Sequence, residues 1–257
     1  IRYLKNADNT KKYTIEVPVY LNPLADLIKI NRDQDIAIMM YGGVPDSPFN
    51  GGRLNYCLDG VNIGNRPFPQ LNRDQLNKVR EKFFHTVEEA NQNGLPFLFA
   101  LTNMYVRQDE LTDQNLQPIR RLAEWGQAYG IKNGVILYNE LLENHLRHIF
   151  GDRLRYVSSC TKYVSPRRIL SPAETLEMYV RDSEKYDYIV LTPQDSRRES
   201  LIKRVLTASR CPVVLICNSY CSNACNSYYH YDYFSRENKK SVRQISFWDI
   251  ITRSCAF

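Results

Sequence analysis

Ile36-Ala-Ile-Met-Met-Tyr-Gly-Gly43 is the stretch of sequence that decides the fold. Its apolar run shows no alternation with polar residues and stops at two glycines. Such a run is typical of a strand buried on both faces, as strands of parallel sheets are. Because parallel neighbours need a crossover connection, the stretch predicts helices on either side of it.

The rest of the chain repeats this unit. Further strands are predicted at 13–19, 96–102, 134–138, 155–159, 186–191, 213–216 and 242–247. Helices are predicted at 23–31, 73–93, 112–129, 140–150, 171–185, from about 196 to 209, and at 227–240. Eight strand–helix units predict a (β/α)8 TIM-like barrel, formed as a single domain over residues 1–257. An open doubly wound sheet is the alternative, although no Gly-x-Gly-x-x-Gly follows the first strand.

Composition agrees with an ordinary globular protein. The chain has 257 residues, of which 43% are hydrophobic and 24% charged, enough to bury a core without disulfide bonds. No apolar run approaches the roughly 20 residues of a membrane span. No signal-peptide pattern is found, and the seven cysteines are not spread as in a secreted scaffold. We therefore expect a cytoplasmic protein without a membrane partner.

The net charge of +6 is carried by dispersed arginines and lysines. A dispersed charge favours a solvated mixed surface over a dedicated nucleic-acid-binding face. It suits a phosphorylated partner only weakly.

Two loops stand out. The first runs from about residue 42 to 71 and holds Asn50-Gly-Gly-Arg53 and Cys57. A loop of this length inside a compact domain is usually functional or disordered, and its polar content favours function. The second is the cysteine loop at 217–226, which directly follows an apolar strand.

Cysteines gather at one face of the predicted barrel. Five of the seven fall after the carboxyl ends of strands: Cys57, Cys160, Cys217, Cys221 and Cys225. Thiolates at one site favour a soft metal centre. We predict Cys57, Cys217, Cys221 and Cys225 as ligands, with Cys160 as the alternative fourth thiolate. A [4Fe–4S] cluster is favoured over zinc because zinc motifs usually pair two short cysteine knuckles. Plain buried thiols are the competing interpretation.

Polar residues at the same face are the candidate catalytic groups: Arg53, Asn103, Glu140 and Asp195. Arg53 offers a guanidinium for a phosphate or carboxylate, and Glu140 a general base. The competing interpretations are a surface glycine turn for Arg53 and a helix-dipole partner for Glu140. Lys162 is expected to be solvated.

These features resemble the peptidase U32 family of barrel proteins. The resemblance rests on the βα rhythm, on Val135-Ile-Leu-Tyr-Asn-Glu-Leu-Leu142 before Leu154-Arg-Tyr-Val-Ser-Ser159, and on a late strand feeding Cys221-x3-Cys225. Members of that family include proteins that bind [4Fe–4S] clusters through four cysteines. They support hydroxylation of ubiquinone precursors or RNA bases, and others are described as collagenase-like peptidases.

By this resemblance, Cys221 and Cys225 correspond to the close cysteine pair and Cys57 to the early cysteine. Cys217 or Cys160 then supplies the fourth ligand. The spacing of Cys217 and the Asn-Gly-Gly-Arg loop depart from the family pattern, and no peptidase constellation is visible.

The resemblance implies an iron–sulfur barrel protein that assists hydroxylation-type modification of an RNA or small aromatic substrate. An electron donor or a partner protein would serve it. The alternatives are a barrel hydrolase or lyase for a phosphorylated or sugar substrate, with structural zinc or no metal, and a binding module without chemistry.

Overall fold

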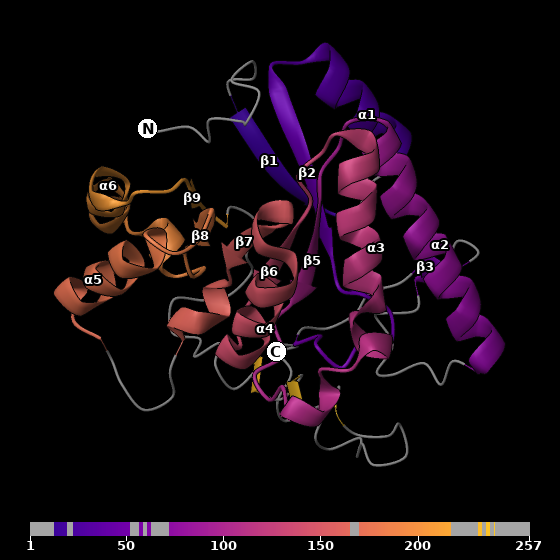
Figure 1. Cartoon of the computed structure of the whole chain (residues 1–257). Coiled ribbons are helices and arrows are strands. Elements are labelled where there is room, and N and C mark those ends of the chain that lie inside the picture. The colour runs from indigo at the N-terminus through magenta and orange to yellow at the C-terminus, as the bar shows by residue number, and fades with distance from the viewer. Residues whose placement is uncertain are drawn as a thin grey trace.

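A computed structural model gives the fold of the chain (Figure 1). It describes residues 13–19, 23–51, 57–58, 61–62, 72–164, 170–216, 231–232, 235–236 and 239. The predicted eighth strand at 242–247 lies outside these residues. The predicted helix at 227–240 is described only at residues 231, 232, 235 and 236, which are helical, and at 239.

A parallel sheet of seven strands forms the centre of the described structure. The strands are β1 (Tyr13–Pro18), β2 (Ile36–Gly42), β5 (Phe97–Leu101), β6 (Gly134–Leu137), β7 (Arg155–Ser158), β8 (Tyr188–Val190) and β9 (Val213–Val214). They pair in chain order, β1-β2-β5-β6-β7-β8-β9, and every pairing is parallel. An order that never reverses is that of a barrel rather than of a doubly wound sheet.

Within the described residues up to 216, six α-helices alternate with the strands and run around the sheet (Figure 1). They are α1 (Leu24–Asp33), α2 (Arg73–Gln92), α3 (Asp113–Tyr129), α4 (Glu140–Phe150), α5 (Pro172–Ser183) and α6 (Glu199–Ala208). The described residues therefore form a half-barrel consistent with a TIM-like fold, as the strand–helix rhythm predicted.

Local signals in the sequence fix several helix ends. Asn139 caps α4, and its side chain accepts a hydrogen bond from the backbone of Leu142. Ser171 and Glu174 form the predicted capping box of α5, which satisfies backbone donors at both positions. Gly130 ends α3 in the left-handed conformation at φ 68°, which glycine adopts without steric cost.

The sheet separates two apolar layers. Outward-facing side chains such as Phe97, Phe99 and Leu137 pack against the helices in the larger core. Inward-facing side chains form a smaller cluster made of Met39, Leu98, Ile136, Val157, Tyr188 and Val190. Alternate residues of each strand serve the two layers, which is why the strands read as continuous apolar runs.

The long loop is only partly irregular. Residues 43–51 fold back against the start of the β5–α3 connection, with Val44, Phe49 and Asn50 buried. A small antiparallel pair follows, formed by β3 (Cys57–Leu58) and β4 (Val61–Asn62).

Candidate functional site

The carboxyl ends of the strands meet at the lower end of the sheet in Figure 1, and we call this edge the mouth. Because all seven strands are parallel, their following loops gather there. The candidate residues predicted from the sequence follow the ends of these strands.

Asn103 joins three loops at the mouth. It is fully buried, and its Nδ2 donates to Asn50 O at 2.8 Å and to Ser235 O at 3.0 Å. Its own backbone N–H donates to Phe49 O at 2.9 Å. Asn103 and Asn50, which are 53 residues apart, are thus brought together, and the amide holds backbone in place.

Gly51 explains part of the Asn50-Gly-Gly-Arg53 motif. A Cβ built at Gly51 would lie 2.0 Å from the carbonyl oxygen of Thr102. Only glycine permits this backbone approach, so this glycine is needed for packing the loop against the β5 end. Arg53 lies outside the described residues.

Asp195 is buried in a turn rather than turned toward a cavity. Its Oδ2 accepts hydrogen bonds from Tyr179 Oη and Thr192 Oγ1, both at 2.9 Å, and its Oδ1 accepts one from Arg198 at 3.1 Å. Burial, followed by the adjacent Asp195 carboxylate, raises the pKa of Tyr179 well above its ordinary value. The carboxylate therefore ties α5 to the loop after β8.

Glu140 occupies the first turn of α4 and is exposed to solvent. The neighbouring Asn139 contacts the Asn103 loop, because its Nδ2 donates to Met104 O at 3.4 Å. The carboxylate of Glu140 makes no described contact with Asn103 or Asp195.

Cys160 is the predicted ligand whose side chain is described. It follows β7 within the 3-10 turn η3 (Cys160–Tyr163) and packs, half-buried, against the inward-facing cluster. Its Sγ lies 3.9 Å from Tyr231 Oη. Cys57 is described only as a backbone position in β3, while Cys217, Cys221 and Cys225 lie outside the described residues.

Five described residues reach the mouth from the far end of the sequence: 231, 232, 235, 236 and 239. Ser235 is buried, and its Oγ accepts from the Met104 backbone at 3.1 Å. Asp232 accepts from Tyr105 Oη, and Arg236 bonds both Asp232 and Tyr105. Lys239 Nζ donates to Pro48 O at 2.7 Å and to Glu110 Oε2 at 2.6 Å. These contacts anchor the segment to the loops after β2 and β5.

Sequence reasoning missed a charged cluster between α4 and α5. Glu143 is fully buried and pairs with Arg147 at 2.9 Å, Lys185 at 3.0 Å and Lys162 at 3.3 Å, and also accepts from Tyr186 Oη. Burial alone would raise the pKa of Glu143, but the Tyr186 hydrogen bond and the Lys162 charge hold it below its ordinary value. The expectation of a solvated Lys162 is therefore wrong: its side chain is largely buried, and burial lowers its pKa.

Sequence reasoning also missed two charged residues on the inner side of the sheet, Glu16 and Arg155. Glu16 on β1 faces inward, and burial raises its pKa to about 7 even though Arg155 opposes the shift. Arg155 on β7 is itself buried, with Nη1 3.5 Å from Met39 Sδ and its guanidinium 5.1 Å from the centre of the Tyr188 ring. Inward-pointing charge in an apolar strand has no local signal, because periodicity marks only the apolar face.

Metal-ligating side chains do not cluster within the described part of the chain, where no three His, Cys, Asp or Glu residues are grouped to hold an ion. Cys160 is the one thiol described at the mouth. Among the helices that the structure describes, none is long and apolar enough to span a bilayer.

The described residues form a parallel α/β, TIM-like architecture, and a known structure shares this fold. The U32 peptidase Mk0906 aligns with a TM-score of 0.52 and 13% identity, over 93% of this chain and 84% of that one. The IolI protein, solved with a bound zinc atom, aligns at 0.45 and 11%, over 95% and 90%. No family model and no curated protein sequence matches the chain. At these identities the likeness to Mk0906 defines the fold alone.

Proposed function

We propose that this chain is a U32-like TIM-barrel enzyme that binds an iron–sulfur cluster at the mouth. It would assist hydroxylation-type modification of an RNA or small aromatic substrate, served by an electron donor or partner protein. The fold likeness to a U32 peptidase structure supports the barrel part of this proposal. The cysteines predicted at the mouth support the cluster part of the proposal, since thiolates gathered at one site are the ligands of such clusters.

The observation that carries the proposal is the contact between Cys160 and the first described residue after the cysteine loop. Tyr231 Oη lies 3.9 Å from Cys160 Sγ. Before the loop, Ile216 packs against the same inward-facing cluster as Cys160, and its N–H donates to Ser196 Oγ at 3.1 Å. The described residues before and after the loop thus both lie at the mouth, which supports the proposal that the loop supplies thiols there.

The residues of the mouth fit a cluster in donor type. Cys160 offers a soft sulfur ligand within an otherwise apolar and aromatic surrounding, and such a surrounding limits water and tunes redox potential. The proposed set is Cys57, Cys217, Cys221 and Cys225, with Cys160 as the alternative fourth thiolate. When bound, a [4Fe–4S] cluster supplies one-electron chemistry. The chain's own contribution is to exclude water and to hold the loop ends, through Ile216 and Tyr231.

The hydrolase or lyase alternative receives less support. Asn103 and Asp195 already form hydrogen bonds with backbone and side chains of the fold. Glu140 faces solvent on the first turn of α4. A general base and its helpers must converge on one substrate position, and these side chains do not share described contacts.

Anaerobic purification with iron and sulfide analysis tests the proposal. We expect a broad absorbance band near ~400 nm and roughly four irons per chain, as four thiolates carry such a cluster. Cys221→Ser and Cys225→Ser should each lose most of the iron. Cys211→Ser is the matched control, because Cys211 lies at the opposite end of β9 and should leave the iron content unchanged.

Colourless protein without iron after cluster reconstitution would refute the iron–sulfur assignment. About one zinc per chain and no colour would instead make the cysteine loop a structural clip. Equal iron loss in the Cys211→Ser control would show that the thiols act through folding rather than ligation.

A further inference from the structure

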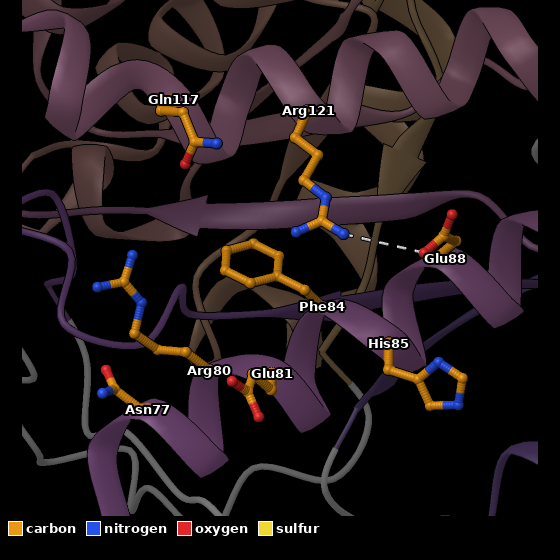
Figure 2. A pocket seen from close by; sticks show the side chains of 8 residues that line it. All are labelled: Asn77, Arg80, Glu81, Phe84, His85, Glu88, Gln117 and Arg121. Atoms are coloured by element: carbon orange, nitrogen blue, oxygen red, sulfur yellow. Dashed lines mark ion pairs between the residues drawn. The ribbon is translucent and has the colours of Figure 1, made fainter. Parts of the chain in front are cut away.

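A groove of about 400 Å³ lies on the outer layer, between α2 and α3. Figure 2 shows the eight side chains that line it. They are Asn77, Arg80, Glu81, Phe84, His85 and Glu88 from α2, and Gln117 and Arg121 from α3. The buried Phe84 ring forms the floor, and each helix brings one amide and one guanidinium.

Arg121 is held in place but not saturated. Its guanidinium lies 4.4 Å from the centre of the Trp125 ring and 5.4 Å from that of Phe84. The nearest carboxylate oxygen, on Glu88, is 3.9 Å away, which is beyond hydrogen-bond distance. Stacking fixes the plane of a guanidinium and leaves the N–H groups at its edge free to bind.

Arg80 stands across the Phe84 floor from Arg121 (Figure 2). It is half-buried and makes no hydrogen bond or ion pair with any residue that the structure describes. A guanidinium that has lost part of its water without gaining a partner is costly, and an anion between the two arginines would relieve that cost. The amides of Asn77 and Gln117 offer further donors. Glu81 and His85 are exposed at the rim.

We propose that this groove binds a small ligand that presents an oxyanion, either carboxylate or phosphate, to Arg80 and Arg121. A flat apolar part of the ligand rests on Phe84. Guanidinium groups bind both oxyanions in a bidentate manner, so the shared chemistry defines the ligand class. The site lies on the helix layer outside the sheet.

Titration of ¹⁵N-labelled protein with inorganic phosphate and, separately, with benzoate tests the site by nuclear magnetic resonance. Saturable shifts should appear in amides of α2 and α3 and weaken as salt is added. Response to phosphate alone identifies a phosphate ligand, and response to benzoate alone identifies a carboxylate on a flat ring. Arg80→Gln should weaken binding by about tenfold, the size expected for one charge-assisted hydrogen bond.

Arg120→Gln is the matched control. Arg120 neighbours Arg121 on α3 but pairs with Asp113 at 2.7 Å and does not line the groove. The Arg120→Gln variant should bind the probes as tightly as the wild type does. The spectra of Arg80→Gln and Arg120→Gln report whether each variant folds. No saturable shift with either probe, or equal binding by the Arg80→Gln variant, would overturn the proposal.

Discussion

At the scale of single residues, two of the candidate catalytic groups, Asn103 and Asp195, make hydrogen bonds within the fold. Asn103 was singled out because it follows a strand, and this placement is right. Its amide, however, serves the backbone of Asn50 and Ser235. A sequence shows where a polar residue stands relative to a strand end. It does not show whether a carbonyl from a distant segment already occupies that residue's hydrogen bonds.

Glu16 gives the first prediction at this scale. Its pKa is raised to about 7 from 4.5, mainly by burial. A raised carboxyl pKa contributes stability below the unfolded value, and that contribution is lost as pH rises through 7. As pH rises from 5 to 8, the free energy of unfolding of the wild type should therefore fall by roughly 2–3 kcal/mol relative to that of Glu16→Gln. Urea unfolding of both proteins at the two pH values measures this fall.

An exposed carboxylate provides the control. Glu199 pairs with Lys203 on the surface of α6, so the effect of Glu199→Gln should hardly change with pH. A constant difference between wild type and Glu16→Gln across this range would show that Glu16 titrates normally.

At the scale of elements, helix ends were the most predictable feature. The Asn139 cap, the Ser171 capping box and the Gly130 terminus all rest on contacts within a few residues. Short-range hydrogen bonds are written in the local sequence. The ion pair between α4 and the turn after α5 is different, because Glu143 meets Lys185 across 42 residues of chain, and only the folded chain brings them together.

Glu143 gives the prediction at this scale. Glu143→Gln would leave Arg147, Lys162 and Lys185 without their shared carboxylate. Losing the buried carboxylate should cost roughly 1–3 kcal/mol, because Glu143 is buried while Arg147 and Lys185 are partly exposed and their charges are screened by water. Chemical denaturation at neutral pH should detect this loss. Because the pKa of Glu143 is lowered, its contribution is present above 4.5 and fades as pH falls through the lowered value.

Glu140 supplies the matched control on the same helix. Its side chain is exposed in the first turn of α4, so Glu140→Gln should cost less than about 1 kcal/mol. A similar loss for both variants would mean that the cluster around Glu143 adds no stability of its own.

At the scale of the whole molecule, the strand order is the central result. Seven parallel strands pair in chain order, and β1 and β9 are the edges of the described sheet. The side chain of Ile15 on β1 is 46% exposed, although its strand is otherwise apolar on that face. An edge strand carries backbone groups without a ladder partner on one side. The predicted strand at 242–247 is the segment that would close the barrel against β1.

Hydrogen exchange on β1 tests this closure. If 242–247 pairs with β1, the amides of residues 13–17 should be protected in the full chain and exchange faster after truncation at residue 241. The amides of β5, which is paired on both sides, should change little. Equal exchange of β1 in both proteins would contradict closure by this segment.

Sequence alone determined the parallel α/β class, the order of strands and helices, and the face at which polar residues gather. These follow from periodicity and local caps, which act over a few residues. Tertiary structure alone decided which of those polar residues form hydrogen bonds and ion pairs within the fold. Asp195 is bound by Tyr179 and Thr192, and Glu16 and Glu143 become buried charges. Burial and long-range pairing depend on surfaces that meet only after the chain has folded, so no local pattern records them.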